Sequence, residues 1–164
     1  MFFNRVAEAC ERLSAVGIET FVPMESKIVV DAEGKRNVMR QPLVNSLMFF
    51  RGTADDVAVV RHELNAKAMI YHTPGKPREA SPISDSEMEI FRLVTDNMDV
   101  PLKYLGADTE KYTVGERVRV IAGPLEGAVG HVCRIRGDRR LVVSIAGVCA
   151  VATTYIPANL LSKL

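Results

Sequence analysis

The segment 114–132, VGERVRVIAGPLEGAVGHV, constrains the fold more than any other part of this chain. Apolar and charged residues alternate over 117–120, which is the pattern of a half-buried β-strand. The Gly-Pro pair at 123–124 then interrupts the strand, and the apolar positions resume at Val129. A strand, a tight turn and a second strand in so short a span predict a small, strongly bent β-barrel.

The rest of the C-terminal part continues this pattern of short apolar stretches with brief connections. Strands are expected near 117–121, 128–136, 140–145 and 149–154, with a final turn at 157–160. Such short connections fit a small antiparallel barrel. The preceding segment, 98–113, has weak periodicity and a proline, so we expect a linker there, with at most a short turn of helix.

The first hundred residues mix helical and strand patterns. Apolar residues spaced by three and four predict helices over 4–16 and 54–64, and a third helix that begins after Ser84. Ser84 followed three residues later by Glu87 is a capping-box pattern. Strands are expected at 18–23, 27–30, 36–41, 47–51 and 68–71, with 27–30 and 36–41 forming a hairpin. The proline-rich segment 73–82 is expected to be an ordered loop.

These patterns together predict an α+β protein with two domains. Residues 1–97 are expected to form an α/β sandwich with an antiparallel sheet, 98–113 the linker, and 114–164 an SH3-like β-barrel. The composition is ordinary for a globular protein, with 48% hydrophobic and 25% charged residues. Residues 1–100 carry 12 basic and 15 acidic side chains, a net −3, whereas 101–164 carry 9 and 5, a net +4. This uneven charge fits two modules with different partners.

The sequence shows no segment that predicts membrane insertion or export. No apolar run approaches the ~18 residues of a membrane span. The N-terminal stretch lacks the apolar core and cleavage site of a signal peptide. We therefore expect a cytoplasmic protein that does not bind a membrane.

Catalytic and metal-binding patterns are also missing from the sequence. The three histidines are isolated and the three cysteines lack CxxC spacing, so no metal site is expected. The glycines of 123–130 lack the Lys-Ser/Thr ending of a phosphate loop and suit tight turns instead. We expect neither a cofactor nor enzymatic activity.

The clearest basic cluster lies in the segment 134–140. Its cations are Arg134, Arg136, Arg139 and Arg140. One interpretation is a solvated hairpin tip, and the other is a contact with RNA or with another partner. The sequence leaves both open.

Four segments carry a resemblance to a known family. The segment 114–132 resembles the KOW motif of NusG-type transcription factors and of some ribosomal proteins. Upstream, the segments 21–23, 40–50 and 75–88 resemble, in the same order, the conserved stretches of the NusG N-terminal (NGN) domain. Gly-Lys-Pro at 75–77 and Glu-Met-Glu at 87–89 look most like the specialised UpxY-type branch, whose members are antiterminators of long polysaccharide operons.

The resemblance implies a transcription elongation or antitermination factor. Its N-terminal domain would bind the clamp of RNA polymerase, through apolar residues at positions that match the family's contact surface. These are Leu43, Val44, Leu47, Phe3 and Tyr71. The KOW domain would bind a ribosomal protein or a termination factor, and nontemplate DNA or nascent RNA are further partners. The alternative is a ribosome-associated or structured-RNA-binding protein that uses the KOW barrel.

Two departures from the family pattern stand out. Asn45-Ser46-Leu47 replaces the family's Pro-Gly-Tyr, so an aromatic ring of the polymerase-binding surface is absent. The family's first strand, which precedes the first helix inside the sheet, also has no counterpart here. Since unpaired strand neighbours are costly, we expect either that the true start lies upstream or that another segment fills the position.

Overall fold

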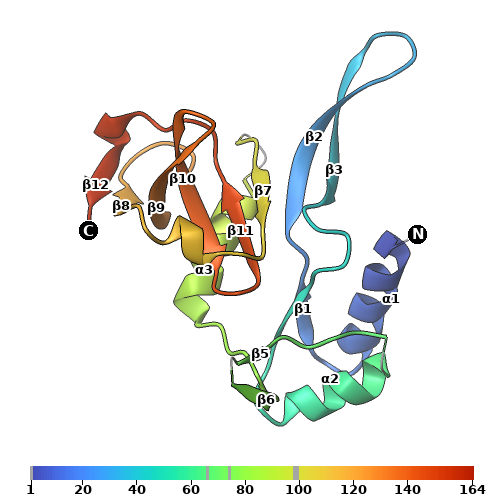
Figure 1. The fold of residues 1–164 in the computed structure, drawn as a ribbon. Coiled ribbons are helices and arrows are strands. Elements are labelled where there is room, and N and C mark those ends of the chain that lie inside the picture. The colour runs from blue at the N-terminus through green and yellow to red at the C-terminus, as the bar shows by residue number, and fades with distance from the viewer. Residues whose placement is uncertain (1, 66, 74, 98–99) are drawn as a thin grey trace. The chain divides into compact units, whose positions relative to one another are not determined.

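The structure is a computed structural model that describes residues 2–65, 67–73, 75–97 and 100–164, with the side chains of 2–4 left out. It contains α-helices and antiparallel sheets, which confirms the predicted α+β class. The chain divides into two compact units. The first consists of residues 1–23 and 44–82, and the second of residues 24–43 and 83–164. Figure 1 labels the elements of both units.

The first unit is built from two helices and two small antiparallel sheets. Its elements are α1 (Phe2–Ala15), β1 (Glu19–Phe21), β4 (Phe49–Arg51), α2 (Asp56–Leu64), β5 (His72–Thr73) and β6 (Lys76–Ala80). β1 pairs with β4, and β5 pairs with β6. The predicted helices and the first strand are thus confirmed to within a few residues.

The core of the first unit joins the two helices to the β1–β4 pair. Leu13, Ile18, Val60 and Leu64 are buried together, and the partly buried Phe50 of β4 packs against them. α1 ends at Ala15. Gly17 follows two residues later with a φ of 81°, which suits a glycine after a helix end. The N–H of Ile18 then donates to the Leu13 carbonyl, which turns the chain directly into β1.

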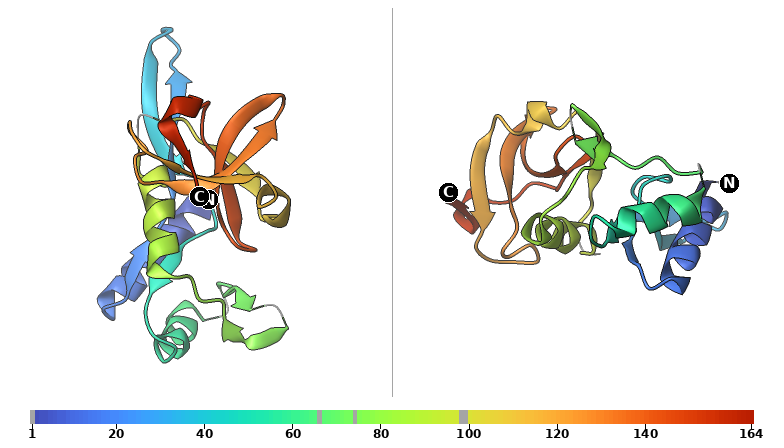
Figure 2. Two further views of the ribbon diagram at one scale, coloured as in Figure 1. Left: turned by 90° about the vertical axis from the view of Figure 1, so that its left-hand side faces the viewer. Right: turned by 90° about the horizontal axis from the view of Figure 1, so that it is seen from below.

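The second unit contains a six-stranded antiparallel sheet. Its strands are β7 (Lys103–Gly106), β8 (Glu116–Val120), β9 (Val129–Ile135), β10 (Asp138–Ile145), β11 (Cys149–Ala152) and β12 (Leu161–Lys163). Their order is β12-β8-β9-β10-β11-β7, with 3₁₀ turns η1 (Glu110–Tyr112) and η2 (Ala158–Leu160). The sheet is strongly twisted, as both views in Figure 2 show.

The alternation seen in segment 114–132 accounts for β8 and β9. Val118 and Val120 are buried, whereas Arg117 and Arg119, which alternate with them, are exposed. After β8, Gly123 and Gly127 adopt φ values of 89° and 90°, and Gly127 N–H donates to the Val120 carbonyl. These left-handed positions favour glycine, so the predicted strand–turn–strand is confirmed.

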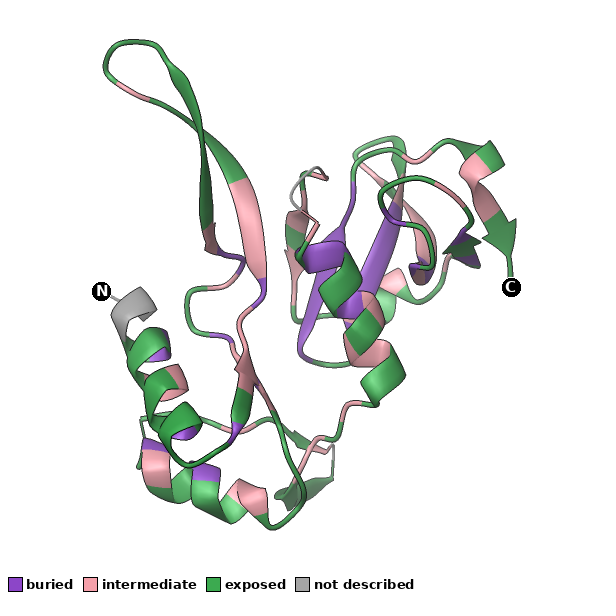
Figure 3. Cartoon of the chain, turned by 180° about the vertical axis from the view of Figure 1, so that it is seen from behind, coloured by how far each residue is buried: buried purple, intermediate pink, exposed green. Residues whose placement is uncertain are grey.

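A long hairpin and a helix complete the second unit. The hairpin consists of β2 (Met24–Val30) and β3 (Arg36–Pro42), and most of it is exposed (Figure 3). The helix α3 (Asp85–Thr95) lies against β10. Arg40 of β3 forms an ion pair of 3.9 Å with Asp96, just after α3. The predicted cap is present, since Glu87 N–H donates to the Ser84 hydroxyl oxygen over 3.2 Å.

Two element predictions around residue 75 are wrong. The predicted strand 68–71 is not formed, and the predicted loop 73–82 contains β6 and the end of β5. Pro77 suggested a loop because proline cannot donate to a strand ladder. β6 tolerates it because a two-stranded sheet leaves one edge of each strand unpaired.

Other expectations concern the linker and the missing strand. The segment 98–113 contains β7, which pairs with β11, and η1. The boundaries at 97/98 and 113/114 stay predictions. In the described ranges no third strand joins β1 and β4, and the expectation of an upstream start stays a prediction.

We predict that Gly130→Ala destabilises the second unit by about 1–3 kcal/mol, the usual cost of overpacking. A Cβ at this position would overlap the backbone carbonyl of Val142 on the neighbouring strand, so β9 or β10 must shift. Urea unfolding measures the change. Ser162→Ala, at an exposed position of β12, is the control and should stay within about 0.5 kcal/mol. Equal stability of the two variants would contradict the close approach.

We predict that Ser84→Ala costs about 1 kcal/mol in the free energy of unfolding, because an N–H of the first turn of α3 loses its acceptor. Ser84→Asp retains an accepting oxygen and adds a favourable charge at the helix N-terminus. Urea unfolding should therefore rank Ser84→Asp close to the native chain. A loss as large as that of Ser84→Ala would show that the cap is not what stabilises this end.

Candidate partner-binding surfaces

The predicted polymerase-binding residues differ widely in exposure. Leu43 and Leu47 are buried, with 8% and 7% of their surface exposed, while Val44 is half-buried and Tyr71 is 50% exposed. Phe3 lies in α1, but its side chain is outside the described part of the chain. Val44 and Tyr71 are thus the described members of this set that a partner can reach.

A short turn positions the residues around Val44. The N–H of Leu47 donates to the Val44 carbonyl over 3.2 Å, and Asn45 and Ser46 are exposed at the tip. Asn-Ser therefore supplies a turn where the family has Pro-Gly, in keeping with the turn preference of asparagine. Leu43 belongs to the second unit, whereas Val44, Leu47 and Tyr71 belong to the first.

Sequence reasoning missed Met69 as an accessible apolar residue. It is 92% exposed and lies two residues before Tyr71. The apolar run 68–71 was predicted to be a strand, and the alternation of such a strand would already have placed Met69 and Tyr71 on one side. An exposed methionine beside an exposed tyrosine is typical of a contact surface.

The four arginines of the basic cluster meet on the β9–β10 hairpin. The turn lies at Arg136 and Gly137, with φ values of 52° and 91°. Arg134 and Arg139 are directly opposite each other on the two strands, and both are exposed. Arg140 differs, because its guanidinium lies 3.4 Å from the Asp138 carboxylate and its side chain is only 27% exposed. The cluster therefore lies at a hairpin turn, and its charges are not equivalent.

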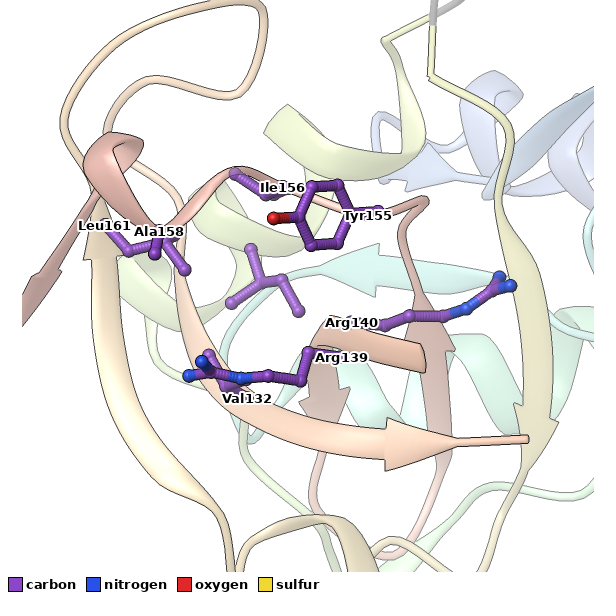
Figure 4. Close-up of a pocket in the computed structure, with 8 residues that line it drawn as sticks. Val132, Arg139, Arg140, Tyr155, Ile156, Ala158 and Leu161 are labelled. Carbon is purple, nitrogen blue, oxygen red and sulfur yellow. The ribbon is translucent and has the colours of Figure 1, made fainter. Parts of the chain in front are cut away.

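A small pocket opens beside this hairpin. Arg139, Arg140, Leu141 and Tyr155 are among the residues that line it, and Figure 4 shows the Tyr155 ring and the Arg139 side chain on opposite sides. Tyr155 is 64% exposed and lies outside any strand or helix. No sequence pattern singled it out, because only the fold brings residue 155 next to 139.

Burial favours the neutral forms of two thiols and one imidazole in the second unit. Burial raises the pKa of the Cys149 thiol to about 12, and burial also raises that of Cys133. Burial and the nearby Arg117 lower the pKa of His131, which favours the neutral imidazole. Within the described ranges, no three His, Cys, Asp or Glu side chains are grouped to hold a metal ion. No described helix is long and apolar enough to cross a membrane.

Comparison with known proteins identifies the N-terminal part. A family model described as "Transcription termination factor nusG" matches residues 1–92, which is more than half of the 164 residues. A search of the curated proteins found no match. Members of this family are transcription factors that act with RNA polymerase, and they are not typically enzymes. The chain belongs to the NusG family of transcription termination and antitermination factors.

Proposed function

We propose that this protein is an elongation and antitermination factor that binds the RNA polymerase clamp through residues 1–97 and recruits a second partner through residues 114–164. The family match over residues 1–92 carries the proposal. The C-terminal residues form a KOW domain of SH3-like barrel type, joined by the linker 98–113. The twisted antiparallel sheet β12-β8-β9-β10-β11 supports this assignment. The motifs at 75–77 and 87–89 favour the UpxY-type branch.

The proposed clamp surface is apolar and belongs to the first unit. Val44 and Tyr71 contact the polymerase, and Met69 adds exposed apolar area next to Tyr71. Leu43 and Leu47 flank the turn at Val44 in the sequence, and because both are buried we assign them no direct contact with the polymerase. Phe3 remains part of the proposed surface. Burying such side chains drives association, since apolar area leaves water.

The proposed mechanism is binding to one conformational state of the polymerase. A factor that binds the closed clamp more tightly than the open clamp shifts the population toward the closed state. A clamp that stays closed resists the rearrangements that lead to pausing and termination. No chemical step is required of the factor.

The second partner binds the C-terminal domain in this proposal. Residues 101–164 carry a net charge of +4, and Arg134, Arg136, Arg139 and Arg140 project from one hairpin. A ribosomal protein, a termination factor, nascent RNA and nontemplate DNA are the candidate partners. The alternative of a ribosome-associated protein is less well supported, because the N-terminal 92 residues match a transcription-factor family.

We predict that the double variant Val44→Asp, Tyr71→Ala loses at least tenfold in affinity for core RNA polymerase. It places a charge in the apolar surface and removes an aromatic side chain of the kind that dominates interface energies. Pull-down and surface plasmon resonance with purified polymerase measure the loss. Neither residue lies in the buried core, so the circular dichroism spectrum should stay native.

The matched control is Val114→Asp, which introduces the same charge at an exposed apolar residue of the second unit. It should bind polymerase like the native chain. Undiminished binding by the double variant would refute this surface, and loss of binding by both variants would point to a nonspecific effect of charge.

A further inference from the structure

We propose that the pocket beside the β9–β10 hairpin, lined by Tyr155, Arg139 and Leu141 and lying next to the Arg134–Arg139 pair, binds single-stranded nucleic acid. The inference deepens the partner-binding half of the proposed function and rests on it. It assigns the ligand chemistry and adds Tyr155, which lies outside the arginine cluster.

The first observation is an uncompensated pair of like charges. Arg134 and Arg139 are Cα partners in the β9–β10 ladder, so their side chains leave the same face of the hairpin. Like charges directly opposite each other on two strands are destabilising. The nearest acid in sequence, Asp138, is paired with Arg140. Across the described part of the chain, neither Arg134 nor Arg139 has an ion pair. A bound phosphate would relieve this repulsion, because guanidinium groups recognise phosphate oxygens.

The second observation is an accessible aromatic ring across the pocket from Arg139. Figure 4 shows the Tyr155 ring opposite the Arg139 side chain, whereas the Arg140 guanidinium points the other way. Leu141, which lines the pocket, is buried on the Arg139 face of β10. An exposed ring beside an apolar wall offers a stacking surface for a base, and every base has a π-face to place there.

These two observations together select the ligand. A nucleotide carries its phosphate and its base at opposite ends, and the pocket has the Arg139 side chain on one side and a ring on the other. An acidic peptide would use the arginines but has no planar group for Tyr155. A double helix would leave the ring unused as well, because its bases are stacked on one another inside the duplex. The arrangement therefore fits a single strand, with nascent RNA and nontemplate DNA as the two possible sources.

The test measures binding of the 164-residue chain to a fluorescent oligouridylate, an oligodeoxythymidylate and an RNA duplex by anisotropy across a range of salt concentrations. Tyr155→Ala should weaken single-strand binding about tenfold, and Tyr155→Phe should retain it, since stacking needs the ring. Arg139→Gln should weaken binding and reduce the salt slope by about 0.7, the value for one phosphate contact on a single strand. The ratio of RNA to DNA affinity distinguishes the two sources.

The control is Arg119→Gln, which removes the same charge from the opposite face of the sheet. Arg119 is exposed between the buried residues Val118 and Val120, and Val118 shares its face with Leu141 through the β8–β9–β10 register. This variant should bind single strands nearly as well as the native chain.

Several results would overturn the site. The proposed site is wrong if the native chain does not bind single strands or if it binds the duplex as tightly as a single strand. It is also wrong if the Tyr155→Ala variant keeps the native affinity for single strands. Tighter, Tyr155-dependent binding of an oligoglutamate peptide would assign the pocket to a protein partner instead. The same variants should still pull down polymerase, because Tyr155 and Arg139 take no part in the proposed clamp surface. Failure of the nucleic-acid site is therefore distinguishable from failure of the clamp proposal.

Discussion

The second unit depends on the close approach of β9 to β10 at Gly130. A side chain there would meet the Val142 carbonyl, so the absence of a Cβ lets the two strands lie at this spacing. Gly115 has the same relation to the Val132 carbonyl at the start of β8. Because neither glycine has a Cβ, the backbone can approach the neighbouring strand closely at these two positions of the six-stranded sheet.

The register of β9 against β10 determines which side chains lie on the face of the sheet that is proposed to bind a partner. Val132 is opposite Leu141, and Arg134 is opposite Arg139. Because side chains alternate along a strand, a slip of one residue would move each set to the other face. Leu141 would then leave the face that it shares with Val118, and Arg139 would leave the side of the hairpin that faces Tyr155. The charge pattern and the apolar core of this sheet are fixed by the same pairing.

Much of this sheet could be predicted because its signals are local. The alternation around Val118 and the glycines of the following turn specify a strand, a turn and a strand without reference to the rest of the chain. Ser84 likewise marks the start of α3, because a capping hydroxyl acts on N–H groups two or three residues away.

The parts that could not be predicted depend on tertiary contacts. The resemblance implied contacts for Leu43 and Leu47, but their burial is a property of the folded chain. The sequence also gave no sign that α3 lies against β10, although residues 85–92 fall within the family match. β5 was missed because it has only two residues, and β6 was missed because it contains a proline. Tyr155 was missed because its neighbours in the pocket are distant in sequence.

The two proposed surfaces use different physical forces, and this difference bears on how one chain can hold two partners. Met69 and Tyr71 are themselves accessible apolar side chains, so association through them depends on area removed from water and responds little to salt. At Arg134 and Arg139 the accessible groups are cations, and counterion release makes binding weaken steeply as salt rises. In the proposed function, a rise in salt would therefore weaken the nucleic-acid contact more than the polymerase contact. The two proposed contacts of one chain can then be separated by their salt dependence, with the N-terminal surface as the salt-insensitive one.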